Sequence, residues 1–123
     1  MPENTYIGAI DQGTTGTRFM VFDHAGQVVA NADETHEQIY PEPGWVEHDP
    51  TEIWENTKTV VVRALEESGI APEQLAGLGI TNQRETTLLW DEETGKPIYN
   101  ALVWQDRRTT DRVEEVQADG KVE

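Results

Sequence analysis

The sequence contains no cysteine, which excludes disulfides, thiolate nucleophiles and cysteine-based zinc sites. It also lacks any apolar run close to the ~18 residues that a membrane-spanning helix needs. The start, Met-Pro-Glu-Asn, is neither basic nor followed by a long apolar segment, so no secretory signal is expected. These absences predict a cytoplasmic protein without a membrane span.

Lysine is scarce, because three Lys and six Arg stand against 24 acidic residues, giving a net charge of −15. Nucleic acids require a basic footprint and anionic membranes attract basic segments, so neither is an expected partner. At molar salt the Debye length falls to ~3 Å, and the self-repulsion of such a chain is screened. The charge therefore predicts a halophilic protein, adapted to high intracellular salt.

The 123 residues suit one domain, and hydrophobic patterning argues against disorder. Apolar runs predict three strands joined as an antiparallel meander, then an irregular proline-containing loop. A helix is predicted to begin at the N-cap Asp49, followed by Pro50, and to end at Gly69. We expect strands over 5–11, 17–23 and 27–36, and the irregular loop over 38–50.

The second half is predicted to add a short turn over 71–75, a buried strand over 76–81, a hairpin, and a final helix over 108–118. The hairpin has arms 86–90 and 97–104. Trp54 is expected in the core beneath the first helix. The three histidines lack metal-ligand spacing and are expected to be surface or loop residues: His24, His36 and His48.

The first strand ends at Asp11 and is followed by Gln12-Gly13-Thr14-Thr15-Gly16-Thr17-Arg18. Glycines let a backbone approach an anion closely, and successive N–H groups form a nest for phosphate. Asp11 beside such a cradle could hold Mg²⁺ or its water shell. The segment is not a P-loop, since it lacks the lysine and leads into a strand. An ordinary hairpin turn rich in small residues would look similar.

A second group of polar residues follows the predicted strand 76–81. Arg84 offers up to five N–H donors and Glu85 two acceptor oxygens, which together can bind neighbouring hydroxyl groups of a polyol. The face of Trp104 could cover the C–H surface of the same ligand. On spacing alone, a surface ion pair and a core tryptophan would also fit.

These segments together resemble the FGGY carbohydrate kinase family, and within it the members that act on glycerol. The turn 11–15 resembles the first phosphate motif of the actin-like ATPase superfamily. The matching segments cover most of the chain in the same order: 11–15, 37–41, 43–50, 53–54, 79–87, 94–101 and 103–105.

The resemblance implies an α/β protein with the actin-like ATPase (ribonuclease H-like) fold, having a mixed sheet with flanking helices. It implies ATP-dependent phosphorylation of glycerol to sn-glycerol 3-phosphate, with ATP and Mg²⁺ as cofactors. Asp11 would place Mg²⁺, directly or through water. The remaining roles would be phosphate binding by Gly13, Thr14, Thr15, Gly16 and Arg18, and glycerol binding by Arg84, Glu85 and Trp104.

The resemblance also implies that residues 1–123 form the N-terminal portion of the first FGGY domain, with the rest of that domain and the second domain absent. The catalytic base, an aspartate in the family, would lie downstream, so no catalytic residue is expected within this chain. We expect the chain alone to be inactive and the full-length protein to be a homo-oligomer. Position 16 is glycine where many members have serine, and Asp106 has no expected role.

Three alternatives stay open. Another FGGY kinase could act on a pentulose or similar polyol, although Arg84 and Glu85 within Thr-Asn-Gln-Arg-Glu-Thr-Thr favour glycerol. A non-metabolic actin-like nucleotide-binding module would share the turn 11–15, but it has no use for Arg84, Glu85 and Trp104 around one small ligand. The third alternative is a truncated, inactive chain.

Overall fold

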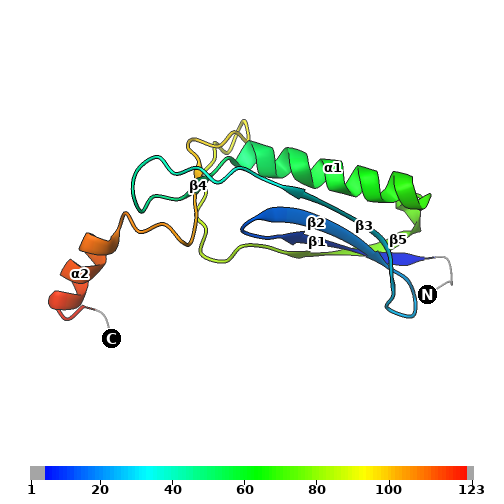
Figure 1. Cartoon of the computed structure of the whole chain (residues 1–123), viewed down its shortest axis with the longest axis horizontal. Coiled ribbons are helices and arrows are strands. Elements are labelled where there is room, and N and C mark those ends of the chain that lie inside the picture. Colours follow the sequence, from blue (N-terminus) through cyan, green and yellow to red (C-terminus); the bar gives the residue numbers. More distant parts are fainter. Residues whose placement is uncertain (1–4, 122–123) are drawn as a thin grey trace.

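A four-stranded mixed sheet forms the centre of the computed structural model, which describes residues 5–121 (Figure 1). Strands β1 (Tyr6–Gln12), β2 (Gly16–Phe22) and β3 (Val28–Thr35) form the predicted antiparallel meander. Strand β5 (Leu75–Thr81) joins the other side of β1 in parallel, so the order is β3-β2-β1-β5. The expectations for residues 1–4 and 122–123 lie outside the described residues.

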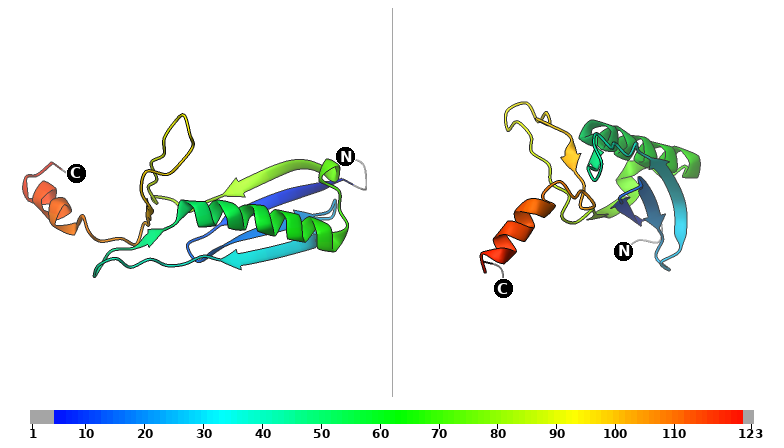
Figure 2. Two further views of the ribbon diagram at one scale, coloured as in Figure 1. Left: turned by 90° about the horizontal axis from the view of Figure 1, so that it is seen from above. Right: turned by 60° about the vertical axis from the view of Figure 1, so that its left-hand side comes forward.

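Helix α1 (Pro50–Ser68) lies along one face of the sheet, over β2 and β3 (Figure 2). Its ends follow the predicted signals. The side chain of Asp49 accepts a hydrogen bond from the N–H of Thr51, and Gly69 closes the helix with a left-handed φ of 71°. Glu52, in the first turn of α1, accepts a 2.6 Å hydrogen bond from the N–H of Glu37, which ties the helix start to the chain after β3.

The core lies between α1 and the sheet. Phe19 and Val21 of β2 pack there with Val60 and Ala64 of α1, and all four are buried. Trp54 does not join them: it is 60% exposed, with the ammonium of Lys58 5.5 Å from its ring centroid. The expectation of a core Trp54 was therefore wrong. Lys58 lies one turn further along the helix, so its ammonium can reach the exposed indole face.

Strand β5 was expected to be buried, but it lies at the edge of the sheet. Leu78 is 54% exposed and Ile80 is 70% exposed. Because α1 covers β2 and β3, no described element covers these two side chains. The 3₁₀ turn Pro72–Gln74 leads from α1 into this edge strand, as the sequence predicted.

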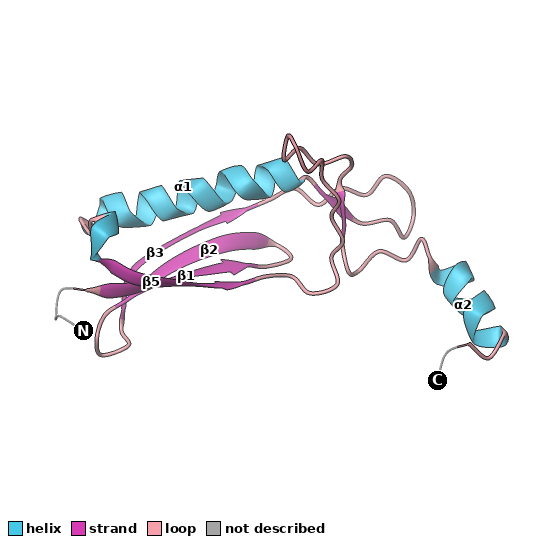
Figure 3. Cartoon of the chain, turned by 180° about the vertical axis from the view of Figure 1, so that it is seen from behind, coloured by secondary structure: helices cyan, strands magenta, loops and turns pink. Residues whose placement is uncertain are grey.

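The remaining elements extend beyond one end of the sheet (Figures 1 and 3). The loop expected to be irregular contains the short strand β4 (Glu47–His48), which pairs with β6 (Ala101–Leu102). The predicted hairpin is present only as isolated bridges, Thr87 with Leu102 and Trp90 with Pro97. Helix α2 (Thr110–Ala118) lies farthest from the sheet. Within residues 5–121, no helix is both long and apolar enough to cross a membrane.

Candidate functional site

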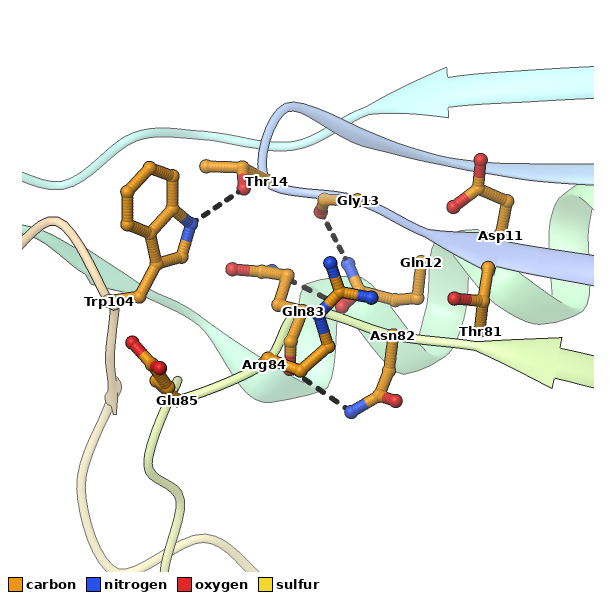
Figure 4. A pocket seen from close by; sticks show the side chains of 10 residues that line it. All are labelled: Asp11, Gln12, Gly13, Thr14, Thr81, Asn82, Gln83, Arg84, Glu85 and Trp104. Carbon is orange, nitrogen blue, oxygen red and sulfur yellow. Dashed lines mark hydrogen bonds between the residues drawn. The ribbon is translucent and has the colours of Figure 1, made fainter.

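A hollow of about 450 Å³ opens where β1 and β5 end side by side (Figure 4). Parallel pairing places Asp11 opposite Thr81, so the turn after β1 and the polar segment after β5 leave the sheet at the same edge. The hollow brings together six residues nominated from the sequence: Asp11, Gly13, Thr14, Arg84, Glu85 and Trp104. It also contains four that were given no role there: Gln12, Thr81, Asn82 and Gln83.

A second hollow, of about 230 Å³, adjoins the first and contains the other nominated phosphate residues. Thr15, Gly16 and Arg18 line this hollow, and Asp11 and Gly13 belong to both. Arg18 lies opposite Asp11 on β1 and opposite Asp33 on β3. The two sides of the turn after β1 therefore face different spaces.

The turn after β1 uses one of its own N–H groups. Gly13 N–H donates a 2.9 Å hydrogen bond to the carbonyl of Gly16. This N–H was expected to face an anion, and it is not free to do so. The N–H groups of Thr14 and Thr15 make no hydrogen bond within residues 5–121. A Cβ at Gly16 would overlap the carbonyl oxygen of Glu34, because β2 and β3 approach closely there. Glycine at position 16 thus permits this close approach.

Trp104 connects the turn to the rest of the hollow. Its indole Nε1 donates a 2.9 Å hydrogen bond to Thr14 Oγ1, and the ring remains half exposed. Because Thr14 Oγ1 accepts this bond, its own hydrogen remains available to donate to a ligand. Figure 4 shows the indole and the Glu85 carboxylate at one end of the hollow and Asp11 at the other.

Glu85 has an unusual backbone. Its φ is 67°, and it is the only residue other than glycine with positive φ in the described chain. A glutamate in this left-handed region carries a cost of the order of 1 kcal/mol or more, and such residues cluster at functional sites. The Glu85 carboxylate makes no hydrogen bond or ion pair elsewhere in residues 5–121.

An ionic cluster that follows Trp104 in the sequence holds the Trp104 segment against the loop that leads into β4. Arg108 bonds Glu47 at 2.7 Å and Asp106 at 2.8 Å, and its guanidinium lies 3.9 Å from the ring centroid of Trp45. Asp106 also accepts a 2.7 Å hydrogen bond from the N–H of Val46. Asp106, which had no role in the sequence analysis, thus joins these two segments.

The titration of this cluster follows from its contacts. The hydrogen bond from the Arg108 side chain lowers the pKa of Asp106 to about 2 and more than offsets burial. Burial alone would raise the pKa of Glu47, but hydrogen bonds from Arg108, Asn100 and Tyr99 lower it. The hydrogen bonds that Arg108 donates to Asp106 and Glu47 raise the pKa of its guanidinium. All three groups are therefore charged at neutral pH.

Two of the histidines expected to be surface or loop residues are buried, although one of them, His36, lies in the loop after β3. His48 is completely buried and His36 is 8% exposed, and their ring centroids lie 4.3 Å apart. A surface position was therefore wrong for both, because they flank the loop between β3 and β4 and their rings pack against each other there. Within residues 5–121, no group of three His, Cys, Asp or Glu side chains could hold a metal ion.

Solved structures similar to this chain include a glycerol kinase and a xylulose kinase. Plasmodium falciparum glycerol kinase with ADP is 38% identical, with a TM-score of 0.84 over 93% of this chain and 23% of that chain. The ligand-bound xylulose kinase of Lactobacillus acidophilus has a TM-score of 0.85 over 94% of this chain and 23% of that chain. At 21% identity, the second likeness shows the fold alone. The expected actin-like α/β fold class is confirmed.

The sequence profile described as "FGGY family of carbohydrate kinases, N-terminal domain" matches residues 6–123. The chain belongs to the FGGY family of carbohydrate kinases. It is 78% identical over 120 residues to glycerol kinase of Haloquadratum walsbyi and 77% identical over 120 residues to that of Haloarcula marismortui. Each match covers 98% of this chain, which spans 24% of the length of those relatives.

Proposed function

We propose that this chain contributes to an ATP-dependent kinase that phosphorylates glycerol to sn-glycerol 3-phosphate. One observation carries the proposal: the turn after β1 and the Arg84–Glu85 segment after β5 open into one hollow with Trp104 between them. A phosphate donor and a polyol acceptor must lie in contact for direct transfer, and this geometry would hold the two against each other. Glycerol kinases among the relatives support the choice of substrate.

The roles within the hollow follow from the available donors and acceptors. The free N–H groups of Thr14 and Thr15, with their hydroxyls, would bind phosphate oxygens, and Arg18 would do so from the second hollow. Arg84 and Glu85 would hydrogen-bond the glycerol hydroxyls, and the exposed face of Trp104 would pack on the glycerol carbons. Gly13 and Gly16 would shape the turn.

Asp11 fits a site in which Mg²⁺ would be bound by the protein and by nucleotide phosphates together. Mg²⁺ keeps several waters and takes one or two protein carboxylates together with phosphate oxygens. Asp11 is an exposed carboxylate that lies against both hollows and makes no ion pair in residues 5–121. When bound, the ion would offset the charge that develops on the phosphoryl oxygens.

In the proposed reaction, a terminal hydroxyl oxygen of glycerol bonds to the γ-phosphorus while the bond from that phosphorus to the β,γ-bridging oxygen breaks. ADP leaves with that oxygen, and a carboxylate accepts the hydroxyl proton. We assign the base to a residue beyond position 123, as the resemblance to the family implies, and propose Asp11 for the metal ion instead. The chain would then be the first portion of the first FGGY domain and inactive alone.

We also propose that the protein is halophilic, cytoplasmic and, at full length, a homo-oligomer. The net charge of −15 and the organisms of the two haloarchaeal relatives support the first of these. Molar salt would screen the repulsion among the acidic side chains.

The test is glycerol-dependent ADP release, with Mg²⁺ in molar KCl, by the full-length gene product. Arg84→Ala should raise the KM for glycerol about 10- to 100-fold and leave the KM for ATP within about threefold, because charged hydrogen bonds to the hydroxyls are lost. Lys96→Ala removes the same charge from a turn outside the hollow and should change neither. Preference for a pentulose, or glycerol-independent ADP release only, would overturn the proposal in favour of another kinase or of a nucleotide-binding module.

A further inference from the structure

His48 is a polar side chain in a fully buried position beside the hollow. It ends β4, directly before the cap of α1, and it is among the largest fully buried side chains of the described chain. A buried polar group is retained at little cost only when it is hydrogen-bonded. Both ring nitrogens of His48 have partners, whereas neither ring nitrogen of the neighbouring His36 has one.

On one side, His48 reaches the turn after β1, the proposed phosphate turn, through Gln38. The Gln38 amide nitrogen donates a 3.0 Å hydrogen bond to the carbonyl of Thr14, which can only accept. The amide oxygen of Gln38 therefore faces His48, 2.7 Å from Nε2. Since that oxygen can only accept, Nε2 of His48 must carry the hydrogen.

On the other side, His48 reaches the Arg84–Glu85 segment through Gln83. The Gln12 amide nitrogen donates to the carbonyl of Gly13 at 2.8 Å, so its oxygen accepts from the Gln83 amide nitrogen at 3.2 Å. The same Gln83 nitrogen lies 3.3 Å from Nδ1 of His48. Because that nitrogen is a donor, Nδ1 must accept, and the neutral Nε2–H tautomer satisfies every contact.

The Gln83 amide oxygen extends the network to the tryptophan. It accepts a 3.0 Å hydrogen bond from Thr86 Oγ1, which in turn accepts from the backbone N–H of Trp104 at 3.3 Å. Gln83 directly precedes Arg84 and Glu85. One imidazole thus lies at the centre of a network that ends on the phosphate turn, on the glycerol-binding segment and on Trp104.

The charge state agrees with this geometry. Burial, and to a smaller extent the nearby His36, lower the pKa of His48 to about 4 against the opposing effect of Glu52. The ring is therefore neutral near pH 7, as one donor and one acceptor require.

We propose that His48 is a positioning residue for phosphoryl transfer, which fixes the phosphate turn relative to the Arg84–Glu85 segment through Gln38 and Gln83. This inference rests on the proposed kinase function. In-line transfer tolerates little displacement of the two bound groups, and an error of about 1 Å can cost ~10²-fold in rate. His48 touches neither substrate and acts only through the two amides.

Variants that keep one half of the network separate positioning from simple packing. His48→Gln can still donate to Gln38 from the position of Nε2 but leaves no acceptor at the position of Nδ1 for Gln83, so it should raise the KM for glycerol about tenfold and that for ATP under threefold. His48→Asn keeps an acceptor near Nδ1 and loses the Gln38 contact, so the pattern should reverse. His48→Phe should raise both and lower kcat. The matched control is His36→Phe, which should leave all three constants unchanged.

The decisive measurements are steady-state kinetics of the full-length protein and ¹⁵N NMR of its histidine rings, with the His48 signal assigned by its loss in His48→Gln. A neutral ring protonated at Nε2 between pH 5 and 8, with the opposite KM patterns, supports the proposal. Equal effects of the Gln and Asn variants, unchanged constants in a folded His48→Phe protein, or an Nδ1–H tautomer would overturn it. A wild-type protein without glycerol activity would refute the kinase function instead, and the NMR result would still test the tautomer.

Discussion

The indole Nε1 of Trp104 donates a 2.9 Å hydrogen bond to Oγ1 of Thr14, a residue 90 positions earlier in the chain. Thr14 lies in the turn proposed to bind phosphate, and Trp104 is proposed to cover glycerol. The bond therefore joins the two halves of the hollow directly, and both side chains face its interior (Figure 4).

We predict that Trp104→Phe, which keeps an aromatic face but loses the donor, lowers kcat/KM about two- to tenfold, the range expected for one hydrogen bond. Thr14→Val removes the acceptor and should have a similar effect. If the bond couples them, the double variant should be no worse than the poorer single variant in the kinetic cycle. Strictly additive losses would contradict the coupling, and Thr14→Ser should restore near-normal rates.

The positive φ of Glu85 makes a second prediction possible, because stability and binding should respond oppositely. Glu85→Gly removes the backbone strain and should raise the free energy of unfolding by about 1 kcal/mol, while raising the KM for glycerol at least tenfold. Glu85→Gln retains the strain, so it should weaken glycerol without stabilising the protein. Denaturant unfolding and kinetics measured side by side check both; a destabilised Glu85→Gly would show that the φ angle carries no strain.

Local signals in the sequence predicted much of this fold. Asp49, Pro50 and Gly69 delimit α1 because capping depends on residues a few positions away. The turn and strand residues before Thr35 likewise predicted the meander. By contrast, the edge position of β5 and the exposure of Trp54 depend on which elements lie beside them, and an apolar pattern does not contain that information.

The sequence indicated several residues that line the hollow, but not the hydrogen bonds that connect them. Asp11, Arg84 and Trp104 stood out because their chemistry suits phosphate and polyol ligands. His48 and Gln38 did not, since their positions follow from long-range pairing of β4 with β6 and from the folding of a proline-containing loop. Gln83 stood next to Arg84 in the same motif, and that proximity was the available signal.

The Arg108 cluster predicts that replacing Arg108 lowers the stability of the protein much more than replacing Arg112, four positions later. Arg108→Met leaves the carboxylates of Glu47, 1% exposed, and Asp106, 7% exposed, without their cation, and should destabilise the protein by about 3 kcal/mol or more. Arg112 pairs with Glu115 in an exposed position, so Arg112→Ala should cost under about 0.5 kcal/mol. Denaturant midpoints measure both. Equal losses would mean that the buried cluster does not support the Trp104 segment.

His48 predicts a pH dependence of stability whose sign can be worked out. The pKa is about 4 in the folded protein, against an ordinary value of 6.5, because burial disfavours the charged ring. Between these values the unfolded chain binds more protons, so the free energy of unfolding should fall as pH drops from 6.5 to 4. At ~1.4 kcal/mol per unit, the loss is on the order of 3 kcal/mol.

The carboxylates of this acidic chain titrate in part of the same range, so the measurement is the difference between wild type and His48→Phe. Phenylalanine binds no proton, and its curve should be flatter between pH 6.5 and 4. His36 and Glu52 face the same ring and are unchanged in the variant. Parallel curves for the two proteins would show that His48 does not stay neutral in the folded state.

The charge distribution of α1 leads to a prediction about salt. Its last turn contains Glu66 and Glu67 and no basic residue, so two negative charges lie at the negative end of the helix dipole. Salt screens this repulsion together with that of the rest of the chain, whose net charge is −15. We expect Tm to rise by about 5 °C or more between dilute buffer and molar KCl.

Replacing Glu66 and Glu67 by Gln should raise Tm in dilute buffer, and by much less in molar KCl, where the charges are already screened. A Tm that stays flat across this salt range would contradict the halophilic proposal, and an equal gain from the two substitutions at both salt concentrations would show that they act through helix propensity instead of charge.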